Sequence, residues 1–351
     1  MSSINHNVIA ERLNLSRATV TRSLANHPSI SAETRDRVLE LAKELGYVRS
    51  PGRAIRRKKL SKNVTVGVLV GVRDRAPGTA TFPFILKGIQ QHAAYEQATI
   101  DVCYQNPDEF DPEGRRHRVF GQIRAANWRG VILIYPFSEP AIESLSRRIT
   151  TVAALEDYVA LGVDSIDTDH SAGIVALVQR LVRAGHRRIG FAAWHYPIGG
   201  HWTVRRFAAF VEGMLSQDVP LHLDWHLNVH PGTPELNREQ LADAVVQRIR
   251  RDGVTAWVCA ADHQAYELIR DLAARGVSVP RDCSVTGFDG IEPPYGLRPL
   301  TTALVPHEDI GAAALGRVMN RLLNPKSPAR KILVGAEIVA GETVAPPPAA
   351  G

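Results

Sequence analysis

The 351-residue chain is poor in cysteine and has no long apolar run. Its cysteines, Cys103, Cys259 and Cys283, are far apart and lack metal-ligand spacing, which argues against a disulfide framework and a zinc site. The longest apolar stretches, such as residues 64–72, are too short to span a bilayer, and the polar N-terminus has no apolar signal segment. We therefore expect a cytosolic protein that is neither secreted nor inserted in a membrane.

Sequence signatures of catalysis are missing as well. The chain has no nucleophile elbow, no phosphate-binding loop and no dinucleotide fingerprint. His195, His201 and His230 lack the tight spacing of metal ligands. We therefore expect that the protein is not an enzyme and binds neither a cofactor nor a metal.

Positive charge is concentrated at the start of the chain. The whole chain has a formal net charge of +6 and a pI of about 9.4. Residues 1–62 contain thirteen Lys and Arg but five acids, a net charge of +8, which leaves the remainder near −2. A two-helix pattern accompanies this charge, so it favours a phosphate-binding module over a merely solvated helix face.

Residues 11–26 predict a short helix, a tight turn and a second helix that reads the major groove of DNA. Ser16 is the predicted N-cap of the second helix. Five apolar residues are spaced to close a small core: Ile9, Leu13, Leu15, Val20 and Leu24. A third helix begins at Ser31 and stops at Gly46. It completes the core with Val38, Leu39, Leu41, Ala42 and Leu45.

Residues 50–62 predict a hinge segment. It is either a solvated linker or a short helix with Ser50 as cap and Pro51 in its first turn, and the block from Arg56 to Lys59 is strongly basic. We favour the helix. Self-repulsion frays such a segment in isolation, so we expect it to become ordered when DNA phosphates neutralise it. Ile55 is the predicted minor-groove wedge, next to Arg56 as a DNA contact.

From residue 64 onward, apolar runs of strand length alternate with amphipathic stretches. This alternation predicts an α/β core of parallel sheets flanked by helices, behind a small all-α head. The predicted strands are 64–70, 100–103, 130–134, 151–154, 165–167, 188–193, 256–260 and 283–287. The predicted helices include 84–97, 173–184, 204–216, 238–252, 265–275 and 309–323. No internal sequence repeat is visible, and residues 345–351 predict a disordered tail.

Six segments carry motifs whose order and spacing are specific: 15–24, 31–38, 44–47, 184–191, 276–289 and 300–302. Together they resemble the LacI/GalR (lactose repressor) family of bacterial transcription regulators. The resemblance implies a helix-turn-helix head at residues 1–49, a hinge helix within 50–62 that meets the minor groove, and a core at 63–344. It also implies that the core resembles periplasmic sugar-binding proteins, with two lobes around a ligand cleft, and that a homodimer binds a near-palindromic operator.

In the head, the resemblance places Arg17 and Ala18 where the family reads operator bases, and Arg22 where it has a DNA-contacting arginine. It gives Thr19 and Thr21 phosphate contacts, with helix packing as the alternative for Thr19. Ser16, as the cap, aims the N-terminal end of this helix at the DNA.

In the core, the resemblance assigns effector contacts to Phe82, Arg206, Asp262 and Asp289, and a structural role to Asp169. Trp202 joins them because the ring-rich loop 194–202 leaves a strand end, where open sheets bind ligands. For the acids, helix capping or a surface ion pair is the alternative; for Trp202 it is packing at the edge of a lobe.

These observations predict a cytoplasmic, ligand-responsive repressor of carbohydrate-utilisation genes. No long terminal heptad segment is present, which favours a dimer over a tetramer. A sugar is the expected effector, because carboxylates, a guanidinium and aromatic faces suit a polyhydroxy ring. A nucleobase-responsive regulator, a sugar-binding protein with another role and an enzyme are the alternatives, and induction and corepression both stay open.

Overall fold

A computed structural model describes residues 6–24, 30–45, 64–72, 81–114, 117–194, 201–230 and 232–348. The chain divides into two compact units, Met1–Lys59 and Leu60–Gly351, which we call the head and the core and describe one at a time. The predicted hinge at 50–62, with Ile55 and Arg56, lies outside the described residues.

Three helices form the head: α1 (His6–Leu13), α2 (Arg17–Leu24) and α3 (Ala32–Glu44). The five apolar residues predicted for the first two helices all lie in one cluster with residues of α3, which confirms the predicted core. Ser16 caps α2 as predicted, because its Oγ accepts a hydrogen bond from the Thr19 N–H at 3.0 Å. Asn14, in the turn before it, has a left-handed φ of 55° that asparagine tolerates.

One residue predicted for the head's core faces solvent. Leu39 is 46% exposed, whereas Val38 and Ala42 are buried. Successive residues of an α-helix are rotated by about 100°, so burial of Val38 turns its neighbour away from the core. The prediction for Leu39 is therefore wrong.

The core has two lobes, each built on a six-stranded sheet. Lobe 1 contains β1 (Val64–Gly71), β2 (Ala98–Gln105), β3 (Trp128–Ile134), β4 (Thr150–Ala154), β5 (Asp164–Thr168) and β11 (Lys331–Val334). Lobe 2 contains β6 (Ile189–Ala192), β7 (His226–Leu227), β8 (Ala256–Cys259), β9 (Ser284–Asp289), β10 (Thr301–Leu304) and β12 (Glu337–Val339). The strand orders are β11-β5-β4-β3-β1-β2 and β12-β10-β9-β8-β6-β7. Neighbouring strands are parallel except β10 and β12.

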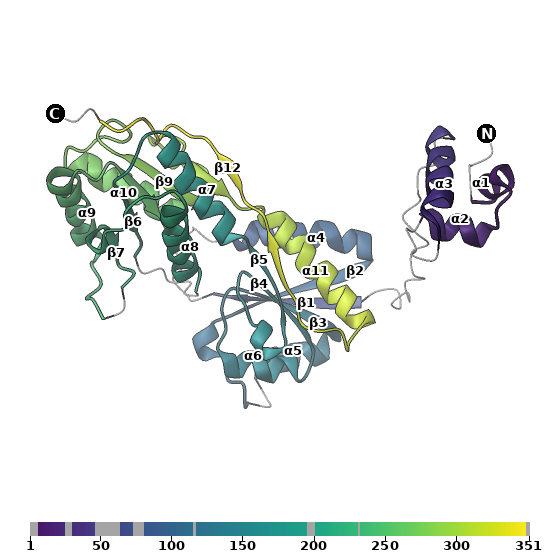
Figure 1. Cartoon of the computed structure of the whole chain (residues 1–351). Helices are drawn as coiled ribbons and strands as arrows, with labels where there is room; N and C mark the ends of the chain where they lie inside the picture. Colours follow the sequence, from purple (N-terminus) through teal and green to yellow (C-terminus); the bar gives the residue numbers. More distant parts are fainter. Residues whose placement is uncertain are drawn as a thin grey trace. The chain divides into compact units, whose positions relative to one another are not determined.

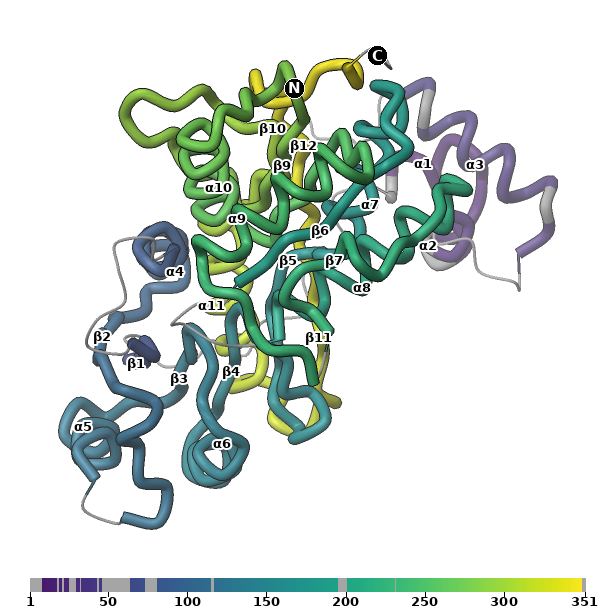
Figure 2. Tube along the Cα trace, turned by 90° about the vertical axis from the view of Figure 1, so that its left-hand side faces the viewer, coloured from purple at the N-terminus to yellow at the C-terminus, as the bar shows by residue number. Residues whose placement is uncertain are grey.

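Helices cover both faces of each sheet, as buried parallel strands require. In lobe 1, α4 (Phe82–Glu96) and α11 (His307–Leu323) cover one face, and α5 (Arg118–Ala125) and α6 (Glu139–Ser146) cover the other (Figure 1). Figure 2 shows β2, β1, β3 and β4 in a row between these two pairs of helices. In lobe 2, α7 (His170–Arg183) and α8 (Trp202–Ser216) contribute to one apolar cluster, and α9 (Arg238–Gln247) and α10 (Asp262–Ala274) to another.

The eight predicted strands and six predicted helices are all present, with ends shifted by a few residues. The predicted helix 238–252 continues beyond α9 as a π-helix, Arg248–Asp252. Six further α-helices and β-strands in the described ranges were not predicted because they are short: α5, α6, β7, β10, β11 and β12. Such elements leave few periods of an apolar pattern to detect.

The prediction of a disordered tail is wrong at the start of that segment. The Ala345 N–H donates to Ser284 Oγ at 3.1 Å, and the Ala345 carbonyl lies 2.8 Å from His186 Nε2. Ala345 is therefore held on lobe 2 by both of its backbone polar groups. Residues 349–351 lie outside the described part of the chain.

The three cysteines are free and buried. Burial raises the pKa of Cys283 to about 12, so this thiol stays protonated and unreactive. No helix in the described ranges is both long and apolar enough to cross a membrane.

The first three strands of each lobe have the same topology, although the sequences of the lobes show no repeat. In both sheets the first strand of the lobe lies between the second and the third. In lobe 1, Gly67 of the first strand lies under the indole of Trp128 on the third strand. In lobe 2, Gly190 lies in the same way under the indole of Trp257. A Cβ on either glycine would overlap the indole, so the same packing occurs twice.

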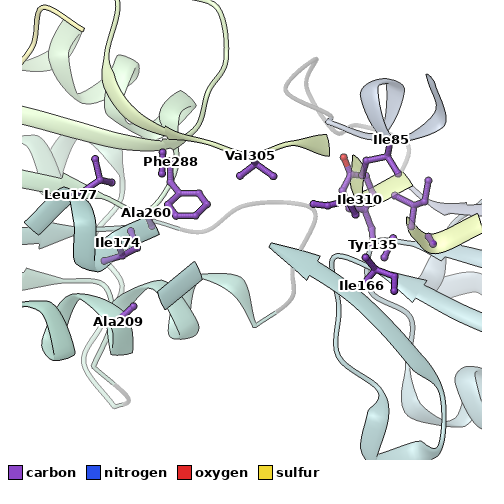
Figure 3. Packing of buried hydrophobic residues seen from close by; sticks show 14 of the residues in the cluster. Ile85, Tyr135, Ile166, Ile174, Leu177, Ala209, Ala260, Phe288, Val305 and Ile310 are labelled. Carbon is purple, nitrogen blue, oxygen red and sulfur yellow. The ribbon is translucent and has the colours of Figure 1, made fainter. Parts of the chain in front are cut away.

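The chain crosses between the lobes at residues 168–170, 304–307 and 334–337. Apolar packing continues through the second crossing. There Val305 lies between Phe288 of lobe 2 and Ile310 of lobe 1, within one buried cluster (Figure 3). The lobes therefore share a core around their connections.

Helices α4 and α11 pack closely through two glycines. A Cβ at Gly88 would overlap the backbone of Glu308, and one at Gly311 would overlap the backbone carbonyl of Ile85. Backbone atoms cannot move aside as the end of a flexible side chain can. Both positions therefore require glycine.

Replacing Gly311 by alanine is expected to lower the free energy of unfolding by about 1–3 kcal/mol, because the added methyl group overpacks the helix contact. Urea unfolding measures the effect. Gly316, on the same helix, is the matched control, because a Cβ there would meet His92 Nε2 at 3.4 Å, an ordinary contact. Gly316→Ala should leave the stability unchanged or raise it by up to about 1 kcal/mol through helix propensity. Wild-type stability in Gly311→Ala would contradict the close packing.

Candidate functional site

A cavity that is partly open to solvent, with about 620 Å³ of empty space, lies between the lobes, where strands of both sheets end. This is the position at which open parallel sheets bind ligands. Its lining residues come from both lobes and from two of the crossings: Thr81, Tyr135, Pro136, Leu155, Glu156, Asp167, Thr168, His170, Trp202, Arg206, Ala261, His263, Asp289, Val305 and His307. The cavity therefore changes shape if the lobes move relative to each other.

Arg206, on the second turn of α8, is the central cation of the cavity wall and is 5% exposed. It donates three hydrogen bonds: Nη1 to the Ala260 carbonyl at 2.6 Å, Nη2 to Asp289 Oδ1 at 3.0 Å, and Nε to His170 Nδ1 at 3.2 Å. Its guanidinium also lies 3.9 Å from the centre of the Phe288 ring and 5.0 Å from that of Trp202. These contacts hold a buried positive charge in one orientation.

Asp289 ends β9 and accepts from Arg206 while lining the cavity. Its φ of 132° is a left-handed conformation that a residue with a Cβ rarely adopts. Such strain persists only where surrounding contacts enforce it, and it concentrates at functional sites. The ion pair with Arg206 is one of those contacts.

Three histidines in the cavity wall favour the neutral form. Burial lowers the pKa of His170 and of His307, and it lowers that of His263 to about 4. Because His170 Nδ1 accepts from Arg206, we assign the proton of this ring to Nε2, which lies 3.4 Å from Asp167 Oδ1. Neutral imidazoles offer one donor and one acceptor each without adding charge.

Tyr135 forms the wall at the end of β3 and has a positive φ of 72°. Its hydroxyl accepts from the backbone N–H groups of Thr81 (2.8 Å) and Phe82 (3.0 Å), at the start of α4. Phe82 packs edge-on against Tyr135 with ring centres 6.4 Å apart. Tyr135 thus satisfies the end of a helix and presents its ring to the cavity.

The structure brings together three of the five effector residues predicted from the sequence. Trp202, Arg206 and Asp289 line the cavity, whereas Phe82 and Asp262 are not among the lining residues. Phe82 lies beside Tyr135, which takes its place at the wall.

Asp262 is fully buried and holds the loop after β9. Its Oδ2 accepts from the N–H groups of Gly290 (2.6 Å) and Ile291 (2.9 Å), and its Oδ1 from the Thr302 hydroxyl at 2.6 Å. Burial and the neighbouring Asp289 raise the pKa of Asp262 to about 7, against these hydrogen bonds. A Cβ at Gly287 would overlap this carboxylate, so β9 passes directly beside it.

Several lining residues were not predicted: Tyr135, Glu156, Asp167, His170, His263 and His307. One signal could have found some of them. Asp167 lies near the end of a predicted strand, and ligands bind at strand ends. His307 had no such signal, because its place depends on the crossing that starts α11. Asp169, expected to be structural, caps α7 by accepting from the Ala172 N–H at 2.9 Å.

In the head, α2 presents the residues predicted to contact DNA. Arg17 and Arg22 are exposed on it. Thr19 Oγ1 lies 2.8 Å from Ser16 Oγ, so both hydroxyls take part in the cap. Ala18 and Thr21 belong to α2, but their side chains, like Ile55 and Arg56, lie outside the described part of the structure.

Comparisons with known proteins match both units. The model for "Bacterial regulatory proteins, lacI family" matches residues 8–50, and that for "Periplasmic binding protein-like domain" matches residues 178–344. The HTH-type transcriptional regulator AglR of Rhizobium meliloti (strain 1021) is 24% identical over 356 residues, covering 98% of this chain and 95% of that protein.

Two solved structures share the fold. The transcriptional regulator CelR–cellobiose complex has a TM-score of 0.63 at 20% identity, over 97% of this chain and 99% of that one. The lac repressor dimer bound to operator and the anti-inducer ONPF has a TM-score of 0.62 at 21% identity, over 98% and 100%.

A helix-turn-helix head together with a two-lobed core around a lined cavity defines a DNA-binding transcription regulator with a ligand-binding domain. The chain belongs to the lacI family of bacterial regulatory proteins. That family consists of transcription regulators and not of enzymes.

Replacing Asp262 by asparagine is expected to flatten the pH dependence of stability. The pKa of this group is about 7 in the folded chain and about 3.9 in the unfolded chain. The folded state binds the proton of Asp262 more tightly than the unfolded state does. The stability that this proton contributes is therefore fully present below a pH of about 3.9 and is lost as the pH rises through about 7. Thermal unfolding measured across this pH range tests it. The exposed Asp218→Asn is the control, and an unchanged slope in Asp262→Asn would contradict the assignment.

Proposed function

We propose that this protein is a ligand-responsive repressor of carbohydrate-utilisation genes, whose effector is a small sugar bound in the cavity between the lobes. The observation that carries the proposal is the grouping of Trp202, Arg206 and Asp289 on one cavity wall. Carboxylate acceptors and guanidinium donors bind sugar hydroxyls, while an indole covers the apolar face of the ring. The cellobiose in the CelR complex supports a sugar for this shared fold.

In this proposal the predicted effector residues have two roles. Trp202, Arg206 and Asp289 contact the ligand. Phe82 and Asp262 do not contact the ligand. Phe82 packs against Tyr135, and Asp262 holds the loop after β9. The neutral histidines supply further donors and acceptors, and no bond of the ligand is broken.

The head binds a near-palindromic operator in the cytoplasm as part of a homodimer, as the lac repressor dimer bound to operator supports. Arg17, Ala18 and Arg22 read bases, and Ser16, Thr19 and Thr21 lie near phosphates. The hinge, with Ile55 and Arg56, enters the minor groove. A ligand that favours one arrangement of the lobes changes the operator affinity through this connection.

A nucleobase is the second candidate effector. A purine also stacks on an indole and pairs with an acid and an arginine, as Trp202, Asp289 and Arg206 allow. The single tryptophan lining the described cavity, beside several carboxylates and neutral imidazoles, favours a ligand rich in hydroxyls.

A thermal-shift screen against monosaccharides, oligosaccharides, sugar phosphates and nucleobases is expected to select a carbohydrate. A ligand at a hundredfold its Kd adds about 2.7 kcal/mol to the stability, because it binds the folded state alone. Arg206→Ala should abolish the shift, whereas the exposed Arg281→Ala should keep it. Selection of a nucleobase would favour the second candidate, and the absence of any shift would count against small-molecule sensing.

Replacing Arg22 by alanine is expected to weaken binding to the cognate operator by about 1–3 kcal/mol, through loss of a bidentate base contact. The operator is first selected from a random DNA pool, and affinities are then measured by fluorescence anisotropy. Arg37→Ala, an exposed arginine on α3, is the matched control and should bind nearly as wild type. Equal weakening by Arg22→Ala on operator and on random DNA would argue against base reading.

A further inference from the structure

The start of α8, in lobe 2, reaches across the cavity to two carboxylates of lobe 1. Glu156 follows β4 and Asp167 lies in β5, whereas His201 is the N-cap residue before α8 and Arg205 lies in its first turn. Polar contacts therefore join the lobes away from the second and third crossings.

Arg205 makes the main contact. Its Nη1 donates to Asp167 Oδ2 at 3.0 Å, and its Nη2 lies 3.5 Å from Glu156 Oε2. At the N-terminus of the same helix, the backbone N–H of His201 donates to Glu156 Oε1 at 3.0 Å. One guanidinium and one helix end thus satisfy two acids of the opposite lobe.

The carboxylates are far more buried than their cation. The side chains of Glu156 and Asp167 are 3% and 1% exposed, whereas that of Arg205 is 24% exposed. A buried carboxylate without a partner is strongly unfavourable, so these acids require a cation near them. If the lobes separated, water would have to replace Arg205 at both sites.

Two histidines near the acids do not replace this contact. His170, at the first crossing, lies 3.4 Å from Asp167 Oδ1, and His201 Nδ1 lies 3.6 Å from Glu156 Oε2. Lys331 pairs instead with Asp157. Burial raises the pKa of Asp167, but His170 and Arg205 outweigh it and hold the pKa below its usual range. Asp167 is thus charged. The backbone N–H of Thr168 donates to its Oδ1 at 2.8 Å within lobe 1, but its cation, Arg205, comes from lobe 2.

We propose that Arg205 is a latch residue, which holds the two lobes together across the cavity and positions Glu156 and Asp167 as ligand acceptors. Both acids line the cavity, whereas Arg205 is not among the lining residues. It therefore acts through them. One contact joins the lobes and arranges one side of the binding site, whatever the effector is.

Replacing Arg205 by methionine is expected to open the lobes, because the two acids then lose their cation. The interlobe distance is measured by double electron–electron resonance in the full chain without ligand. Spin labels are attached at Ala125→Cys on α5 and Ala273→Cys on α10, both exposed. The native cysteines are buried and label poorly. The variant should show longer distances and a broader distribution than wild type.

Three further variants separate a latch from general destabilisation. Arg205→Lys restores the charge and should return part of the short-distance population. Glu156→Gln keeps the side-chain shape and should open the lobes in part. Arg281→Met removes an arginine from an exposed pair within lobe 2 and should leave the distances unchanged.

Circular dichroism confirms folding of each variant before its distances are compared. A wild-type distribution in folded Arg205→Met would overturn the proposal. If Arg205→Met does not fold, Glu156→Gln decides: opening supports the latch and unchanged distances reject it. Because no ligand is added, the outcome is independent of the effector screen.

Discussion

The buried guanidinium of Arg206 is the constraint on which the cavity depends. A buried arginine needs acceptors for its N–H groups, and it finds them in the Ala260 carbonyl, Asp289 and His170. Ala260 follows β8, Asp289 ends β9, and His170 begins α7 at a crossing between the lobes. Satisfying one cation thus brings three elements to one point, and the ion pair helps to offset the strained backbone of Asp289.

On the side of lobe 1, the buried groups of the cavity are carboxylates that need a cation. Glu156 and Asp167 are buried anions that find their cation, Arg205, on the opposite lobe. Two carboxylates that line the cavity, Glu156 and Asp167, are therefore also groups that join the lobes. A ligand that contacts them changes the balance between lobe arrangements, and this differential interaction is what a regulator needs to respond to a small molecule.

Much of the fold could be predicted because parallel strands buried on both faces form continuous apolar runs, as in Val64–Gly71. The head's core followed from helical spacing, except at Leu39. Short α5 and α6 gave no such signal. The repeated topology was also hidden, because Gly67 and Trp128 correspond to Gly190 and Trp257 in packing and not in any sequence similarity.

The sequence by itself determined the class of protein: a basic helix-turn-helix head capped at Ser16, an α/β core, and Trp202, Arg206 and Asp289 at the ends of elements that face a cavity. Only the tertiary structure decided that Asp262 turns into the loop after β9, that Tyr135 replaces Phe82 at the wall, and that His307 arrives from a distant crossing. Periodicity reports which face of an element is buried. Which side chains meet depends on how two lobes, joined by several crossings, pack together.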